Sequence, residues 1–234
     1  MTTTALVTGA NKGIGLQTVK ELAAGGWTVF LGSRDPDRGP AAAAGLAGDV
    51  RVVPIDVTSD ESVGAAVDAV AAAVPALDVL VNNAGITGGG RPPLETTPTD
   101  FLAAYGVNLL GPVRVTKAFL PLLRRSAAPR VVNVSSGMGS IGLVSDPDRL
   151  ESTLVSLVYP SSKAALNMVT VMYAKALPEF RVNAVDPGYT ATDLNGHRGT
   201  QTVEQGAAPV VRAARLGPDG PTGAFLGVDG PVPW

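Results

Sequence analysis

The sequence predicts a single α/β domain in which a doubly wound parallel sheet carries helices on both faces. Three observations predict this fold class. Short apolar runs rich in β-branched residues alternate with Ala-rich helical stretches along the 234 residues. Several of these runs are apolar almost throughout, which is typical of strands covered by helices on both faces. No linker or low-complexity segment divides the chain, so one domain over residues 1–234 is expected.

The expected elements alternate in chain order. Strands are expected at Ala5–Thr8, Thr28–Leu31, Arg51–Ile55, Val79–Asn82, Arg130–Val134, Arg181–Val185 and Gly223–Leu226. Helices are expected near Gly15–Gly25, Glu61–Val74, Asp100–Ser126, Ser161–Leu177 and Val203–Leu216. The alanine run Ala41–Ala44 is expected to form a short helical piece between the second and third strands.

Composition excludes several classes of function. The formal net charge is -2 and no basic run stands out, so neither nucleic acid nor an anionic membrane is an expected partner. The absence of cysteine excludes disulfides, thiolate zinc sites and a thiol nucleophile. The most apolar region, Val63–Val81, is interrupted by Asp68, Pro75 and Asp78 and does not fit a membrane span. With no basic segment before an apolar run at the start, a cytoplasmic protein is expected.

A glycine-rich turn follows the first expected strand and leads into a helix. The segment Thr8–Gly15 places Gly9, Gly13 and Gly15 in a G-x-x-x-G-x-G pattern. Glycines there let the backbone approach a pyrophosphate, and the helix N-terminus offers unpaired N–H groups. The pattern alone could mark only a tight turn. Its place in a β-α-β unit favours a phosphate site.

The second strand ends in residues that bear on the choice of dinucleotide. In such sheets this position faces the adenosine ribose, where an acidic residue suits a free 2′-hydroxyl and an arginine suits a 2′-phosphate. Arg34 comes first, and Lys12 in the glycine turn could reach the same phosphate. Two converging cations favour NADPH over NADH. Asp35 argues the other way, and both cations could instead be solvated surface charges.

Tyr159 and Lys163 stand four residues apart near the start of an expected helix, so they share one helix face. A free phenol has a pKa of about 10, and a nearby cation lowers this value by favouring the phenolate. A tyrosine so placed can exchange a proton with a substrate. The Y-x-x-x-K pattern by itself occurs by chance in many proteins.

Read together, the motifs resemble those of the short-chain dehydrogenase/reductase family over essentially the whole chain. The motifs are Thr8–Gly15, Asp56-Val57, Asn82-Asn83-Ala84-Gly85, Asn108, Val131–Ser136, Tyr159 with Lys163, and Asp186-Pro187-Gly188. The Asn11-Lys12 pair, the long stretch before Tyr159 and the segment Gly223–Trp234 resemble the monomeric, cytosolic-type NADPH-dependent carbonyl reductases. The resemblance implies a Rossmann-type fold and reduction of a small-molecule ketone or aldehyde with NADPH.

The resemblance also implies roles for single residues. Tyr159 would donate a proton to the carbonyl oxygen, and Ser136 (Ser135 is the alternative) would hydrogen-bond the same oxygen. Lys163 would hold the nicotinamide ribose and lower the pKa of Tyr159, while Asn108 would anchor a water of a proton relay. The implied cofactor contacts are Gly9, Asn11, Lys12, Gly13, Ile14, Gly15, Arg34, Asp56, Val57, Asn83, Ala84, Gly85, Tyr159, Lys163, Pro187, Gly188, Thr190 and Thr192. Each asparagine or threonine could instead only order a turn.

Other functions fit parts of the same pattern. An enone reductase, epimerase or dehydratase could use the same scaffold and cofactor. A non-catalytic dinucleotide-sensing regulator would keep the glycine turn but tends to lose the tyrosine or lysine, and both are present here. His197 is the only histidine and has no other metal-ligand residues in its segment, so no metal site is expected.

The stretch between Ser136 and Tyr159 bears on assembly. It contains 22 residues, which is longer than the family usually has. Leu150, Leu154 and Leu157 stand at i, i+4 and i+7, which predicts one apolar stripe of a short amphipathic helix. Our hypothesis is that this helix covers the surface that related proteins use to dimerise, giving a monomer. The alternative is a longer active-site loop that leaves the interface free.

Overall fold

The computed structural model describes residues 2–234 and contains a seven-stranded, all-parallel sheet. The strand order is β3-β2-β1-β4-β5-β6-β7, so the predicted doubly wound fold is confirmed. The strands are β1 (Thr4–Val7), β2 (Thr28–Ser33), β3 (Asp49–Pro54), β4 (Val79–Asn82), β5 (Arg130–Val134), β6 (Arg181–Val185) and β7 (Phe225–Leu226). The seven predicted strands all form: β4, β5 and β6 have the predicted ends, and the ends of the other four differ by at most two residues.

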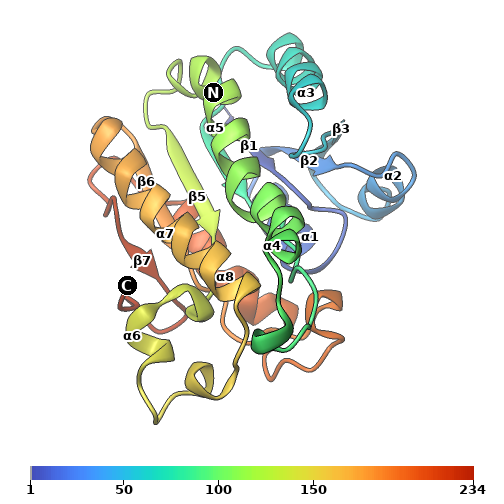
Figure 1. Cartoon of the computed structure of the whole chain (residues 1–234). Coiled ribbons are helices and arrows are strands. Elements are labelled where there is room, and N and C mark those ends of the chain that lie inside the picture. The colour runs from blue at the N-terminus through green and yellow to red at the C-terminus, as the bar shows by residue number, and fades with distance from the viewer. Residues whose placement is uncertain (1) are drawn as a thin grey trace.

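Helices cover both faces of the sheet (Figure 1). One face carries α3 (Asp60–Ala73), α4 (Pro98–Tyr105), α5 (Gly111–Leu123) and α7 (Val158–Ala176). The other carries α1 (Gly13–Ala24), the short α2 (Arg38–Ala43) and α8 (Val203–Ala214). Successive residues of a strand enter opposite layers, as Leu6 packs with Phe119 on the first face and Val7 with Val210 on the second. This explains why successive residues such as Ala5, Leu6 and Val7 of β1 are all apolar.

The order of the sheet reverses between β1 and β4. β1 pairs with β2 on one side and with β4 on the other. In open α/β sheets the crevice outside the carboxyl ends of such strands is where ligands bind. The glycine turn after β1 and the Asn83-Ala84-Gly85 segment after β4 both lie there.

The long helix expected at Asp100–Ser126 is divided. α4 ends at Tyr105, a π-helical turn spans Gly106–Leu110, and α5 follows. In this turn the N–H of Gly111 donates to the carbonyl of Gly106, five residues back. Pro112 has no N–H to give the carbonyl of Asn108 four residues earlier, which interrupts the ordinary helical ladder.

The prediction of an amphipathic helix in the stretch before Tyr159 is wrong. A short α6 (Ile141–Val144) is followed by a 3₁₀ turn at Leu150–Thr153, after which the backbone is extended at Leu154. The hydroxyls of Ser152 and Thr153 donate to backbone carbonyls three residues back, offering the chain an alternative to a regular helix. Leu150, Leu154 and Leu157 are all more than 40% exposed, so no buried stripe forms.

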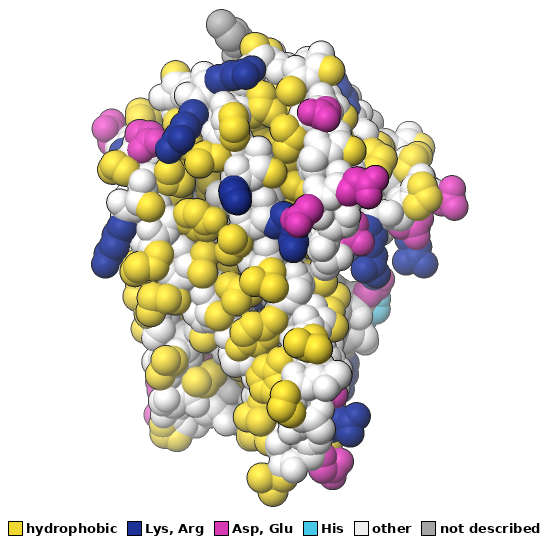
Figure 2. Space-filling model, turned by 45° about the horizontal axis from the view of Figure 1, so that its top comes forward, with side chains coloured by type: hydrophobic (Ala, Val, Ile, Leu, Met, Phe, Trp, Pro, Cys, Tyr) yellow, Lys and Arg dark blue, Asp and Glu magenta, His cyan; other side chains and the backbone are white. Residues whose placement is uncertain are grey.

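The outer faces of the long helices also remain open. Leu102, Leu110, Met168 and Met172 are exposed on α4, the π turn and α7. Figure 2 shows apolar side chains spread over the side of the molecule where α5 and α7 lie in front. The leucine stripe that was expected to cover these faces does not form, and the monomeric state stays a prediction. Within residues 2–234, no helix has the length and apolarity needed to cross a membrane.

A chain of polar side chains crosses the buried face of the sheet under α5 and α7. Asn82 Nδ2 on β4 donates to Asn133 Oδ1 on β5 at 2.8 Å and to Thr116 Oγ1 on α5 at 3.2 Å. Asn133 Nδ2 donates in turn to Thr170 Oγ1 on α7 at 2.9 Å. All four side chains are buried. We call these four residues the polar ladder.

Candidate active site

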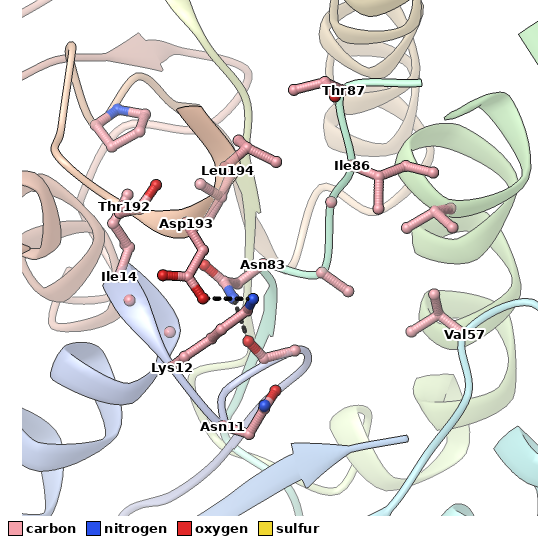
Figure 3. A pocket seen from close by; sticks show the side chains of 18 of the residues that line it. Asn11, Lys12, Ile14, Val57, Asn83, Ile86, Thr87, Thr192, Asp193 and Leu194 are labelled. Atoms are coloured by element: carbon pink, nitrogen blue, oxygen red, sulfur yellow. Dashed lines mark hydrogen bonds and ion pairs between the residues drawn. The ribbon is translucent and has the colours of Figure 1, made fainter. Parts of the chain in front are cut away.

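A cleft of about 470 Å³ opens at the carboxyl ends of the strands. Its size is in the range of small-molecule and cofactor sites. Figure 3 shows the glycine turn and the segments after β4 and β6 around it. The following predicted residues line it: Gly9, Asn11, Lys12, Gly13, Ile14, Gly15, Arg34, Asp56, Val57, Asn83, Ala84, Gly85, Tyr159, Lys163, Pro187 and Thr192.

The glycine turn is packed against the segment after β4. Gly9 has a φ of +61°, and a β-carbon there would lie 2.8 Å from the Cα of Ala84. The amide of Asn83 donates to the carbonyls of Thr8 and Gly9 at 2.9 and 3.1 Å, so this side chain holds the turn in place. Helix α1 begins directly after the turn with no side chain capping its N–H groups. Those free donors and the positive end of the helix dipole suit a phosphate.

The charges after β2 divide into one group that faces the cleft and one that does not. Asp35 Oδ1 accepts the backbone N–H groups of Asp37 and Arg38 at 3.0 Å each, and Oδ2 pairs with the Arg38 side chain at 3.1 Å. These hydrogen bonds lower the pKa of Asp35 and commit its carboxylate to the turn. Arg34 lines the cleft, whereas Asp35 does not. The carboxylate of Asp35, the residue that favoured NADH in the sequence, is thus hydrogen-bonded outside the cleft.

Lys12 lies at the opposite edge of the cleft and reaches the segment after β6. Its Nζ is 2.7 Å from Asp193 Oδ2, an ion pair visible in Figure 3. His197 Nε2 lies 2.8 Å from the other Asp193 oxygen, and the pKa of Asp193 is lowered chiefly by its hydrogen bond with Lys12. His197 therefore belongs to an exposed ion network. The described residues contain no cluster of three or more acidic or histidine side chains suited to a metal.

Tyr159 and Lys163 meet at the inner end of the cleft, on the first turns of α7. Burial raises the pKa of Tyr159 to about 12, while hydrogen bonding with Ser136 acts in the opposite direction. Burial lowers the pKa of Lys163 to about 8. The Lys163 Nζ lies 5.7 Å from the centre of the Tyr159 ring and donates to the carbonyl of Val134 at 2.8 Å. The lowering of the Tyr159 pKa by Lys163 that the resemblance implies does not appear in this arrangement, because burial dominates.

The two serines after β5 have different partners. Ser135 Oγ donates to Asn167 Oδ1 at 2.6 Å and is buried, so its hydroxyl is occupied. Ser136 is only partly buried and lies beside the Tyr159 phenol. Ser135 lines the cleft and Ser136 does not. Because the Ser135 hydroxyl is committed to Asn167, the geometry still favours Ser136, beside the phenol, as the hydroxyl that faces a substrate.

Asn108 lies behind the cleft and is fully buried. Its amide oxygen accepts the N–H of Ile86, and its Nδ2 donates to the carbonyl of Ile86 and to Ser162 Oγ, each at 2.9 Å. The side chain is therefore engaged, and the π turn carries the main chain of Asn108 toward α7. Ser162 in turn donates to the carbonyl of Tyr159 at 2.7 Å, which links Asn108 to the start of α7.

The segment after β6 places its predicted residues differently. Pro187 and Thr192 line the cleft, but Gly188 and Thr190 do not. Thr190 is buried, and its Oγ1 donates to the carbonyl of Pro187 at 3.1 Å, so it braces the turn. Sequence reasoning missed the lining residues Ile55, Ile86, Thr87, Val107, Val134, Asp193 and Leu194. Five of these seven residues are apolar, and their position in the chain, within or close to a strand end or a motif, was the only available signal.

A model of the short chain dehydrogenase family matches residues 3–202. The chain belongs to the short-chain dehydrogenase/reductase family. It is an oxidoreductase of that family, whose members use a nicotinamide dinucleotide.

Individual members of the short-chain dehydrogenase/reductase family align over nearly the full chain. A (+)-neomenthol dehydrogenase of Arabidopsis thaliana is 35% identical, covering 95% of each chain, and a salutaridine reductase of Papaver bracteatum is 33% identical, covering 94% and 93%. The NADPH-bound carbonyl reductase from chicken fatty liver superimposes with a TM-score of 0.87 at 30% identity, covering 100% of this chain and 99% of that one. The alignment with the Arabidopsis protein spans 280 positions, so that relative has segments that this 234-residue chain lacks.

Proposed function

We propose that this short-chain dehydrogenase/reductase reduces a ketone or aldehyde to an alcohol with NADPH. The observation that carries the proposal is the placement of Tyr159 and Lys163 in the lining of a cleft that also contains Arg34, with Ser136 beside the Tyr159 phenol. The tyrosine, lysine and serine fit carbonyl chemistry, and the Arg34 guanidinium fits a 2′-phosphate, whereas Lys12 is paired with Asp193. The relatives with similar folds include an NADPH-bound carbonyl reductase, which supports the same assignment.

The residues of the cleft fit the dinucleotide. The uncapped start of α1 would receive the pyrophosphate, and Asp56 and Val57 would contact the adenine. Arg34 is exposed in the cleft with its neighbour Asp35 committed to the turn, so its guanidinium is free to bind a phosphate. When bound, the cofactor supplies the hydride that the carbonyl carbon receives.

Two side chains, Tyr159 and Ser136, then act on the carbonyl oxygen of the substrate. Tyr159 donates its phenolic proton to the oxygen as negative charge develops there, and Ser136 donates a second hydrogen bond to the same atom. A raised phenol pKa keeps Tyr159 protonated at neutral pH, which is the state required of a proton donor. Lys163 would hold the nicotinamide ribose, and Asn108 would support a water through which Tyr159 regains its proton.

A panel of ketones, quinones and aldehydes tests this function. We expect the purified protein to consume NADPH, followed at 340 nm, with at least one carbonyl compound. The matched control is the Tyr159→Phe variant under the same conditions, which reports consumption that does not depend on the site. A wild-type protein that binds NADPH but reduces no member of the panel would count against the proposal and would favour a regulator.

Cofactor choice gives a separate prediction. Losing a charge-assisted contact to phosphate costs about 1.5–3 kcal/mol, so Arg34→Ala should weaken NADPH binding by roughly ten- to a hundred-fold and NADH binding far less. Arg38→Ala is the matched control, because Arg38 stands in the same corner but pairs with Asp35 outside the cleft. Dissociation constants from cofactor fluorescence decide the matter. A wild type that prefers NADH would show that this corner does not hold a 2′-phosphate.

A further inference from the structure

Asp186 joins two turns at the carboxyl ends of neighbouring strands. It is the first residue after β6, and its own N–H is fixed by the carbonyl of Leu226 at 2.8 Å. Its Oδ1 accepts the N–H of Gly188 at 3.0 Å, and the carboxylate lies against Gly137 after β5, whose N–H lowers the pKa of Asp186. The approach is close, since a β-carbon on Gly137 would lie 3.2 Å from Asp186 Oδ2. One carboxylate thus connects the Ser136-Gly137 turn with the Pro187-Gly188 turn.

These two turns carry residues on opposite sides of the proposed reaction. Ser136 lies beside the phenol of Tyr159, and Pro187 lines the cofactor cleft. Backbone hydrogen bonds between the two turns stop above Ser135, whose N–H reaches the carbonyl of Val185. Beyond the Ser135–Val185 bond, the side chain of Asp186 is what lies between the two turns.

Asp186 also contributes charge at this place. Its negative charge raises the pKa of Tyr159, in addition to the larger effect of burial. Burial raises the pKa of Asp186 itself, and its two backbone hydrogen bonds oppose that effect. The other charged groups acting on it are Glu151 and Arg149, both from the stretch before α7. Glu151 lies against Gly137, where a β-carbon would be 2.7 Å from its Oε1.

We propose that Asp186 is a positioning residue for the reductase reaction, which fixes the Ser136 turn relative to the Pro187-Gly188 turn through its carboxylate. The inference rests on the proposed function, because only a reaction at Tyr159 gives the distance between these turns a kinetic consequence. Asp186 acts through Ser136 and Pro187 and does not itself contact the reacting atoms.

Two variants separate the bridge from the charge. Asp186→Ala removes the carboxylate from both turns, and misplacement of a catalytic group by about 1 Å can cost roughly 10²-fold in rate, so we expect kcat to fall by about that factor with a much smaller change in KM. Asp186→Asn keeps one acceptor oxygen and loses the charge. We expect a kcat loss of roughly ten-fold, together with a shift of the alkaline limb of the pH profile to lower pH, because an anion near Tyr159 favours its protonated form.

Asp68→Asn on the exposed face of α3 is the matched control and should change neither kcat nor the pH profile. If Asp186→Ala folds, as judged by circular dichroism, and keeps kcat within about three-fold of wild type, the inference is overturned. Where Asp186→Ala does not fold, Asp186→Asn decides, because its single amide oxygen replaces two carboxylate oxygens between the turns, and an unchanged kcat overturns the inference. An active wild type with unaffected variants contradicts this inference alone, whereas an inactive wild type contradicts the proposed function.

Discussion

Replacing Tyr159 by Phe should abolish carbonyl reduction while leaving NADPH binding intact. The phenyl ring fills the same partly buried position at the inner end of the cleft, but the proton donor beside Ser136 is lost. A positioned acid contributes typically about 10²–10⁴-fold, so kcat should fall by a factor in that range. Steady-state kinetics and a fluorescence titration with NADPH measure the two quantities separately.

The matched control for this experiment is Tyr173→Phe. Tyr173 stands on the same helix, is also partly buried and packs against the core outside the cleft. The Tyr173→Phe substitution should therefore leave kcat unchanged. A Tyr159→Phe enzyme within a few-fold of wild type would remove this phenol from the mechanism and would require another proton donor.

Lys163→Ala should be at least as damaging, with losses in both kcat and NADPH affinity. The ammonium is almost fully buried, 4% exposed, between the carbonyl of Val134 and the Tyr159 ring. Its removal takes away the proposed ribose contact and the only positive charge of the proposed catalytic set. Lys175→Ala, in the last turn of the same helix, is the exposed control.

The wild-type pH profile provides an independent check on Lys163. Its pKa is lowered to about 8 by burial, so the side chain is cationic below that pH and neutral above it. Since kcat/KM reports groups of the free enzyme, kcat/KM for NADPH should fall as the pH rises through about 8. A flat profile from pH 7 to 10 would show that the charge on Lys163 does not matter for cofactor capture.

Hydrophobic pattern and glycine placement were sufficient to predict the sheet and most of the cleft. The first three residues of β4, Val79–Val81, are all apolar because both faces of the sheet are covered, and that leaves a strong signal. The motifs that line the cleft sit at strand ends, where the topology brings them together. The hydrogen-bond partners of individual side chains left no such signal in the sequence. Asp35 caps a turn, Thr190 braces another and Ser135 pairs with Asn167, and each depends on partners that only the folded chain defines.

Two errors have local physical causes. The π turn around Asn108 arises because Pro112 lacks an N–H, a defect that periodicity does not register. The leucine spacing at residues 150, 154 and 157 imitates a helical stripe, yet Ser152 and Thr153 bond to the backbone and leave the segment without a helix. Periodicity predicts which residues could share a face, but not whether the intervening residues permit the helix.

The polar ladder has a consequence for how the interior of this enzyme can evolve. Asn82 Oδ1 is buried without a hydrogen-bond partner, so the ladder already carries one uncompensated group. Changing Asn133 alone to an apolar residue would leave one N–H of the Asn82 amide without an acceptor, at a cost of about 1–3 kcal/mol, while its other N–H keeps Thr116 and the Thr170 hydroxyl keeps the carbonyl of Leu166. Joint replacement by apolar residues of the same shape can be nearly neutral. Substitutions here should therefore be strongly epistatic, and lineages that lose the ladder should have exchanged several of its positions together.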